Sequence, residues 1–167
     1  MFFRKLTVAA FLAAVLSVSA QGATVSFMVI ETGIREEIPT VDSSRLWEYA
    51  LLDVFFDTGH IVSNTPIVRV AERPLKNLPD EAKASIDEAL EGGAEFFVLA
   101  VLDYQHTPQA GSGRLQPRSI SLRLFQTAPY RFLYSQEYDA NDFRAAEKDE
   151  ISNAMNIARA IATHLRD

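Results

Sequence analysis

Two nearly continuous apolar runs lie along the chain, and each is typical of a strand that is buried on both faces of a sheet. The first run extends from Thr24 to Ile30 (TVSFMVI) and the second from Ala94 to Leu102 (AEFFVLAVL). Both are rich in apolar residues with high strand propensity, and polar residues follow each of them. We therefore expect these two strands at the centre of a sheet.

Three segments repeat apolar residues with helical spacing, and the residues at their ends fit helix boundaries. The first helix is predicted from about Ser44 to Thr58, with Asp42, Ser43 and Ser44 as candidate N-caps and Gly59 after its end. The second opens at Asn77-Leu78-Pro79-Asp80 and closes at Gly92-Gly93, and the third begins near Asp142. Their apolar faces are formed by Trp47, Leu51, Val54 and Phe55, by Ala82, Ile86, Ala89 and Leu90, and by Ile151, Ala154, Ala158, Ile161 and Leu165.

Three further strands are predicted from shorter patterns. His60 to Asn64 and Ile67 to Val70 form one short or irregular strand, and Pro66 between them indicates an edge position because proline cannot donate a ladder hydrogen bond. Ser119 to Phe125 alternates apolar and polar residues, which indicates a half-buried strand. A turn at Thr127-Ala128-Pro129 leads into Tyr130 to Tyr138, so the last two strands form an antiparallel hairpin.

The register of this hairpin follows from pairing its strands about Ala128. That pairing places Leu124 opposite Phe132, Leu122 opposite Tyr134, Arg123 opposite Leu133 and Phe125 opposite Arg131. With this pairing, the apolar side chains of the two strands lie on the same face of the sheet. Because side chains alternate along a strand, a slip of one residue would invert every side chain.

The order of predicted elements is strand, helix, strand, helix, strand, strand, strand, helix, without an internal repeat or a long linker. Two helical crossovers make the first three strands parallel, whereas short connections make the fourth antiparallel to its neighbours. Central apolar runs and an edge position for Pro66 imply the sheet order 2-1-3-4-5. The predicted fold class is therefore α/β: a three-layer domain with a mixed five-stranded sheet.

The first 20 residues have the order of a secretory signal peptide. Arg4 and Lys5 supply positive charge, an uncharged apolar run extends from Leu6 to Leu16, and Val18 and Ala20 occupy the positions that a signal peptidase reads. A membrane-spanning anchor is the alternative, but a span needs about 20 apolar residues, roughly twice the length of this run. We therefore expect cleavage after Ala20.

Removal of the signal peptide, residues 1–20, leaves residues 21–167 as a single α/β domain of 147 residues. The whole chain has 16 basic and 22 acidic residues and a formal charge of -6, and loss of Arg4 and Lys5 lowers that charge to -8. An acidic surface opposes binding to nucleic acid or to anionic lipid. No later apolar run is long enough to cross a bilayer. We expect a periplasmic protein, with secretion from the cell as the alternative.

The chain contains no cysteine. This excludes a disulfide-stapled fold, a thiolate zinc site, a thiol nucleophile and a lipid anchor on cysteine. No spacing motif for a metal or another cofactor is present, so we expect no cofactor and favour a protein that is not an enzyme. An exported domain without disulfides depends on its apolar core for stability.

Four parts of the chain carry a resemblance to known envelope proteins: Leu51 to Ile61, the Gly92 to Leu99 junction, the hairpin, and the closing segment Asn153 to Arg166. With this order of elements, the chain resembles the N-terminal domain of the periplasmic protein TolB. It is also similar to the α/β domains of the curli secretion protein CsgG and of the outer-membrane activators of penicillin-binding proteins. The resemblance implies an envelope module that acts through protein contacts.

Polar residues follow the two central strands, at the edge where ligands bind in open α/β sheets. The candidates for a ligand crevice are Glu31, Thr32, Arg35, Asp103 and His106. Glu31, Asp103 and His106 together are residue types that bind a metal or act as acid and base. The alternative is that strand ends are polar because they meet solvent, and we favour that interpretation because no spacing motif supports a catalytic or metal site.

A second group of residues fits an interaction patch. It combines arginine with apolar residues on the long loop and on the hairpin of an otherwise acidic chain: Arg114, Arg118, Arg123, Phe125, Arg131 and Leu133. This composition is typical of protein interfaces. In the alternative interpretation the last helix covers that face, so that Phe125 and Leu133 are core residues and the arginines are its ion-pair partners.

The sequence favours an exported, non-catalytic accessory or binding module of the bacterial envelope, whose partners are envelope proteins. One alternative is a small hydrolase or ligand-binding protein that uses the strand-end crevice. Another is a subunit of an oligomeric secretion or motility structure, which makes a homo-oligomer a candidate assembly.

Overall fold

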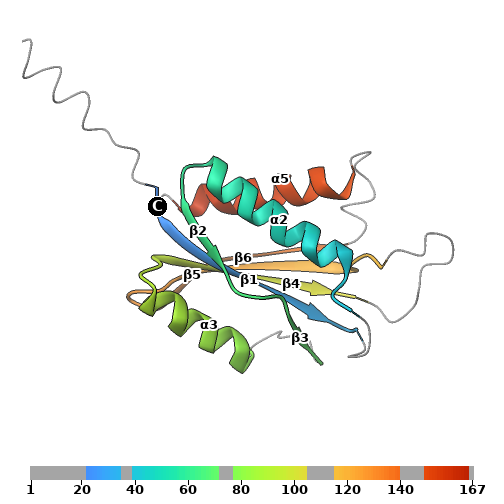
Figure 1. The fold of residues 1–167 in the computed structure, drawn as a ribbon, viewed down its shortest axis with the longest axis horizontal. Coiled ribbons are helices and arrows are strands. Elements are labelled where there is room, and N and C mark those ends of the chain that lie inside the picture. The colour runs from blue at the N-terminus through green and yellow to red at the C-terminus, as the bar shows by residue number, and fades with distance from the viewer. Residues whose placement is uncertain (1–21, 35–38, 72–76, 105–114, 140–148, 166–167) are drawn as a thin grey trace, which may run out of the picture.

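The computed structural model describes residues 22–34, 39–71, 77–104, 115–139 and 149–165 (Figure 1). In chain order its elements are β1 (Thr24–Thr32), α2 (Asp42–Asp57), β2 (Ile61–Asn64), β3 (Val68–Val70), α3 (Asp80–Glu91), β4 (Phe96–Asp103), β5 (Ser119–Gln126), β6 (Arg131–Asp139), α5 (Glu150–Ala162) and the short 3-10 helix η1 (Thr163–Leu165). Helices α2 and α5 lie on one face of a single sheet and α3 lies on the other (Figure 1). This confirms the predicted three-layer α/β fold.

The strands follow the order β2-β1-β4-β5-β6, and β3 also pairs with β1. Strands β1, β2, β3 and β4 pair in parallel, whereas β5 is antiparallel to both β4 and β6. This is the predicted order 2-1-3-4-5, with one difference. The predicted second strand is divided into β2 and β3 around Pro66, which lacks the N–H group that a continuous ladder needs.

Strands β1 and β4 are buried on both faces, as their apolar runs predict. Val25, Phe27 and Val29 pack into the core under α2 and α5, whereas Met28 and Ile30 pack into a separate core under α3. Successive side chains of a strand point to opposite faces, so one apolar run serves two cores. The central pair of strands therefore holds the three layers together.

The boundary of α2 differs from the prediction. The helix begins at Asp42, its N-cap is Val41, and the side chain of Val41 makes no capping hydrogen bond. Ser43 and Ser44 lie inside the first turn and are buried, so the prediction that they serve as N-caps is wrong. The carboxylate of Glu31 takes this role instead, because its Oε1 accepts a hydrogen bond from the Val41 N–H at 2.8 Å.

The boundaries of the other two helices, α3 and α5, were predicted from the residues at their ends. Helix α3 begins at Asp80 and is closed by Gly92 and Gly93, and Gly93 has a φ of 80°, which favours glycine. Helix α5 begins at Glu150. The predicted start near Asp142 lies outside the described residues.

The hairpin forms as predicted, but its predicted register is wrong. Leu124 pairs with Tyr134, two residues beyond the predicted Phe132, and Phe125 pairs with Phe132. A bulge lies between these two pairs. An extra residue on one strand changes which side chains share a face on either side of the bulge. The alternation of apolar and polar residues along each strand does not predict where such a bulge lies.

Asp149 provides a prediction about pH. Its carboxylate accepts a hydrogen bond at 2.8 Å from the Ser152 N–H at the start of α5, and hydrogen bonds from the side chain and backbone of Ser152 lower the pKa of Asp149. Stability from a lowered pKa is present above the unfolded-state pKa and is lost as the pH falls through the folded-state pKa. Between about pH 6 and pH 3, we expect Tm to fall more in the parent than in Asp149→Asn, in which this position does not titrate. Thermal melts that show the same pH dependence for both proteins would contradict this assignment.

Candidate functional site

The ends of β1 and β4 lie side by side, but they do not bring the predicted crevice residues to one face. Thr32 pairs with Asp103, and Glu31 pairs with Leu102. The Thr32 hydroxyl donates a hydrogen bond to Asp103 Oδ1 at 3.2 Å on the α3 side. Glu31 is the next residue along the strand, so its side chain lies on the opposite face, under α2. The two carboxylates of the predicted acid–base group are therefore separated by the sheet.

Glu31 is engaged in structural contacts. Only 1% of its side chain is exposed, and its Oε2 lies 2.5 Å from Nη2 and 3.0 Å from Nε of Arg69, the central residue of β3. Its other carboxylate oxygen accepts the Val41 N–H at the start of α2. Glu31 thus connects β1 to β3 and to α2, which is a positioning role within the fold.

Buried polar side chains fill the space between the strand ends and α2. The hydroxyl of Tyr104, which follows β4, lies 2.7 Å from Ser44 Oγ, and Ser43 donates a hydrogen bond to Glu150. Burial raises the pKa of Tyr104 well above its ordinary range, so the hydroxyl stays protonated at physiological pH. This packing lies beside the strand ends, where the sequence predicts a ligand crevice. Arg35 and His106 lie outside the described residues.

The predicted interaction-patch residues are distributed over both faces of the hairpin. Phe125 is buried and Arg123 is half-buried on the α3 side of β5. Leu133 packs on the opposite side, against the core under α2 and α5. The exposed residues Arg118 and Arg131 lie before β5 and at the start of β6, and Arg114 lies outside the described residues. Two members of the predicted patch, Arg123 and Phe125, lie together at one site.

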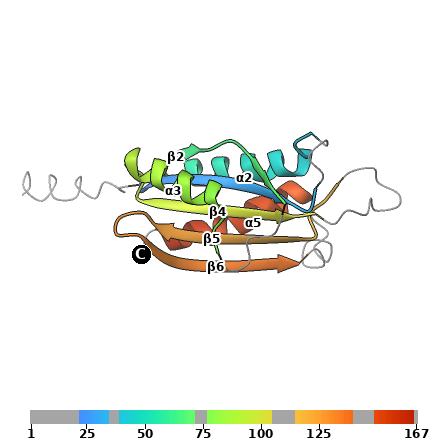
Figure 2. The same ribbon diagram turned by 90° about the horizontal axis from the view of Figure 1, so that it is seen from below.

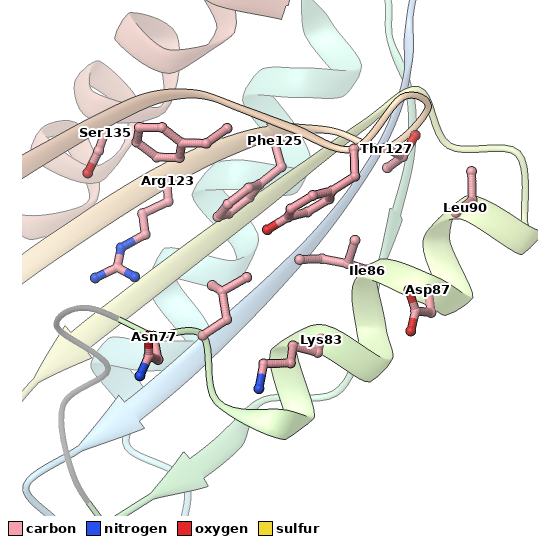
Figure 3. A pocket seen from close by; sticks show the side chains of 12 residues that line it. Asn77, Lys83, Ile86, Asp87, Leu90, Arg123, Phe125, Thr127 and Ser135 are labelled. Atoms are coloured by element: carbon pink, nitrogen blue, oxygen red, sulfur yellow. The ribbon is translucent and has the colours of Figure 1, made fainter.

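That site is a groove between α3 and the β5–β6 hairpin, with a volume of about 880 Å³. Figure 3 shows Arg123 and Phe125 on the strand side of this groove and Lys83 and Ile86 on the helix side. Its lining residues are Asn77, Leu78, Lys83, Ile86, Asp87, Leu90, Arg123, Phe125, Thr127, Tyr130, Phe132 and Ser135. We call this set the hairpin groove.

The groove exists because the two faces of the sheet are covered unequally. Both α2 and α5 pack on one face, and they contact each other. On the other face α3 contacts β1 and β4, and no described helix lies over β5 and β6 (Figure 2). The half of this face that a second helix would cover is therefore open.

Aromatic rings form the apolar end of the hairpin groove. Phe125 stacks on Tyr130 with ring centroids 5.9 Å apart and meets Phe132 edge to face at 5.7 Å. Tyr130 and Phe132 are 57% and 55% exposed, and Leu90 across the groove is 44% exposed. Sequence reasoning did not identify these three residues as part of a site. Their apolar character was visible, but their exposure follows from the open half-face.

The described residues give the hairpin groove an aromatic and charged lining. Within them, no group of three or more His, Asp or Glu side chains is arranged to hold a metal ion. No helix in the same residues has the length and apolar character needed to cross a membrane. The groove combines aromatic surface with Arg123, and both aromatic residues and arginine are enriched at protein interfaces.

Several solved structures are similar to this chain. A PelC dodecamer from Paraburkholderia phytofirmans is 12% identical with a TM-score of 0.49, and 87% of this chain and 89% of that chain are covered. Lipoprotein GNA1162 from Neisseria meningitidis is 14% identical with a TM-score of 0.45, covering 87% and 99%. The LpoB C-terminal domain from Escherichia coli is 12% identical with a TM-score of 0.38, covering 77% and 90%. The resemblance to TolB and CsgG in particular stays a prediction.

No curated protein matches this chain. The sequence model of a protein family does match it, over residues 24–166. This match extends from the first residue of β1 to beyond η1, so it includes every element of the described fold. The chain therefore belongs to the family described as "Uncharacterised protein".

Proposed function

We propose that this chain is an exported, non-catalytic module of the bacterial envelope that binds a protein through the hairpin groove. The observation that carries this proposal is the cluster of half-exposed apolar side chains around the groove, Leu90, Tyr130 and Phe132. Contiguous exposed apolar surface is typical of interaction sites, and aromatic residues contribute most to binding when a partner excludes water from them.

A protein partner fits this groove better than a small ligand does. Ligand pockets bury most of the surface of the molecule that they bind. On the face that carries the groove, no described helix lies over β5 and β6 (Figure 2), and about half of the surface of Tyr130 and of Phe132 is exposed. A small molecule on the floor of the groove would leave these rings in water, whereas a protein surface would cover them.

Site-specific photo-crosslinking in living cells tests this function. A photoreactive phenylalanine analogue replaces Phe132 in the groove, and the same analogue replaces Glu81 on the exposed first turn of α3 as the control. We expect a defined cross-linked protein from position 132 and none from position 81, because only the first position lies in the proposed interface. Equal products from both positions, or none from position 132, would refute groove binding.

A further inference from the structure

The outer face of α2 carries a second exposed apolar surface. Tyr49, Leu52 and Phe56 follow one another at positions i, i+3 and i+7, so they lie on one face of the helix. They are 52%, 39% and 71% exposed. We call these three residues the α2 ridge. Because α2 packs on the sheet through Trp47, Leu51 and Phe55, the ridge is apolar surface that the core does not use.

The α2 ridge also has a shape that suits contact. A depression of about 240 Å³ lies between the ridge and β2, lined by Tyr49, Leu52, Asp53, Phe56 and Val62. It is mostly apolar and has room for part of one aromatic side chain. Tyr130 and Phe132 at the rim of the hairpin groove are exposed side chains of this kind.

The charges beside the two surfaces differ. Asp53 and Asp57 adjoin the ridge along α2, and Glu48 lies on its other side. The one basic residue of α2, Arg45, lies on the same helix face one turn before Tyr49. The groove has Arg123 on its strand side and, on its helix side, Asp87 and Lys83, whose ammonium group pairs with Asp80 at 2.9 Å. A ridge whose carboxylates outnumber its one basic neighbour meets less charge repulsion at a groove that contains Arg123 and Lys83 than it would meet at a second ridge.

The positions of the two surfaces in the fold are also complementary. The groove lies between α3 and the hairpin, on the face where no second described helix accompanies α3 (Figure 2), and the ridge belongs to α2, which lies on the opposite face of the sheet (Figure 1). We propose that the partner in the hairpin groove is a second copy of this chain, whose α2 ridge lies along the groove. The inference rests on the proposed function of the groove and names its occupant.

Such a contact joins two different surfaces, so it is heterologous. Each chain then uses its groove for one neighbour and its ridge for another. A heterologous contact closes into a ring or continues as a filament, depending on the rotation between neighbours. The consequence is specific: one intact groove and one intact ridge are sufficient for each contact.

Complementation between two variants tests this arrangement. Phe132→Asp alters the groove and Phe56→Asp alters the ridge, and both side chains are more than half exposed, so we expect both variants to fold. Ile61→Asp is the control, since Ile61 is 67% exposed and lies in neither surface. Light scattering after size-exclusion chromatography measures the mass of the purified chain and of each variant.

We expect the parent and the control to self-associate and each of the other two variants to be monomeric, with association weakened about thirtyfold or more. An equimolar mixture of Phe132→Asp and Phe56→Asp should form a one-to-one dimer, because each contributes the surface that the other lacks. A mixture that stays monomeric would overturn the ridge-in-groove contact. A monomeric parent would overturn it as well.

Introduced cysteines provide an independent readout, because the chain has none of its own. Leu52→Cys places a thiol on the ridge, and Leu90→Cys places one at the rim of the groove. Under mild oxidation we expect mixed disulfide dimers from the two variants together, and few from Leu52→Cys mixed with the control Glu81→Cys. Equal yields from the two mixtures would contradict the proposal.

The crosslinking result separates this inference from the proposed function. A product of twice the chain mass from position 132 supports the second copy as the occupant. A product with a different protein would preserve groove binding and overturn the second-copy proposal. The absence of any product from position 132 would remove both.

Discussion

Replacement of Val98 by aspartate is expected to prevent folding. Val98 has no exposed surface and lies in the middle of β4, where it pairs with Phe27 of β1 and with Leu124 of β5. A carboxylate at this position would be buried among the apolar side chains of the core under α2 and α5. The energetic cost of burying an unpaired charge is several kcal/mol or more, which is comparable with the whole stability of an ordinary domain, about 5–15 kcal/mol.

Circular dichroism and thermal melting measure this effect. Val98→Ala is the matched control, since it removes only methyl groups and should cost about 2 kcal/mol with the fold retained. We expect the same loss of folding for a charge at Val29, the buried residue of β1 that pairs with Ala100. If either charged variant melted like the parent, the central position of these strands would be wrong.

Replacement of Glu31 by alanine is expected to destabilise the fold by about 3 kcal/mol. Removal of one partner from a buried ion pair costs about 3–5 kcal/mol, because the other charge stays behind without compensation. The side chain of Arg69 is 17% exposed, so water lowers the cost toward the smaller value. The Val41 N–H at the start of α2 loses its acceptor in the same variant.

A double-mutant cycle in chemical denaturation separates the two contributions of Glu31. Replacing the ion pair by Glu31→Leu with Arg69→Met should recover much of the loss, since no unpaired charge is then buried. The remaining loss reports the missing acceptor for Val41. A Glu31→Ala protein with the stability of the parent would show that this carboxylate is not needed by the fold, and the crevice hypothesis would gain weight.

The sheet order could be predicted because it depends on local signals of unusual strength. The runs in β1 and β4 are apolar at nearly every position, which suits only a strand that is covered on both faces. Pro66 then indicates an edge, and the edge strand is indeed divided there into β2 and β3. The lengths of the connections determine which neighbours are parallel.

The hairpin shows where such signals are insufficient. Alternation along β5 and β6 indicates two paired strands, but the register depends on the turn and on the bulge near Leu124 and Phe125. When the two strands are paired about Ala128, Leu133 is predicted to lie on the same face of the sheet as Phe125. In the structure the two lie on opposite sides of the sheet, so the predicted patch is divided.

Glu31 illustrates the same distinction at the predicted crevice. Its position after a central strand makes it a reasonable ligand-binding candidate in sequence. Its partners, Arg69 and the Val41 N–H, are 38 and 10 residues away along the chain. No local pattern predicts that these two segments converge on one carboxylate and engage both of its oxygens.

Local patterning alone was enough for the number of layers, the order of the strands and the central place of β1 and β4, because periodicity and turn residues act over a few neighbours. Which apolar residues remain exposed was decided by the packing of distant elements. Leu90, Tyr130 and Phe132 surround a groove because α2 and α5 share one face of the sheet while α3 covers part of the other. Exposure depends on what lies above a residue, and that is a property of the assembled layers.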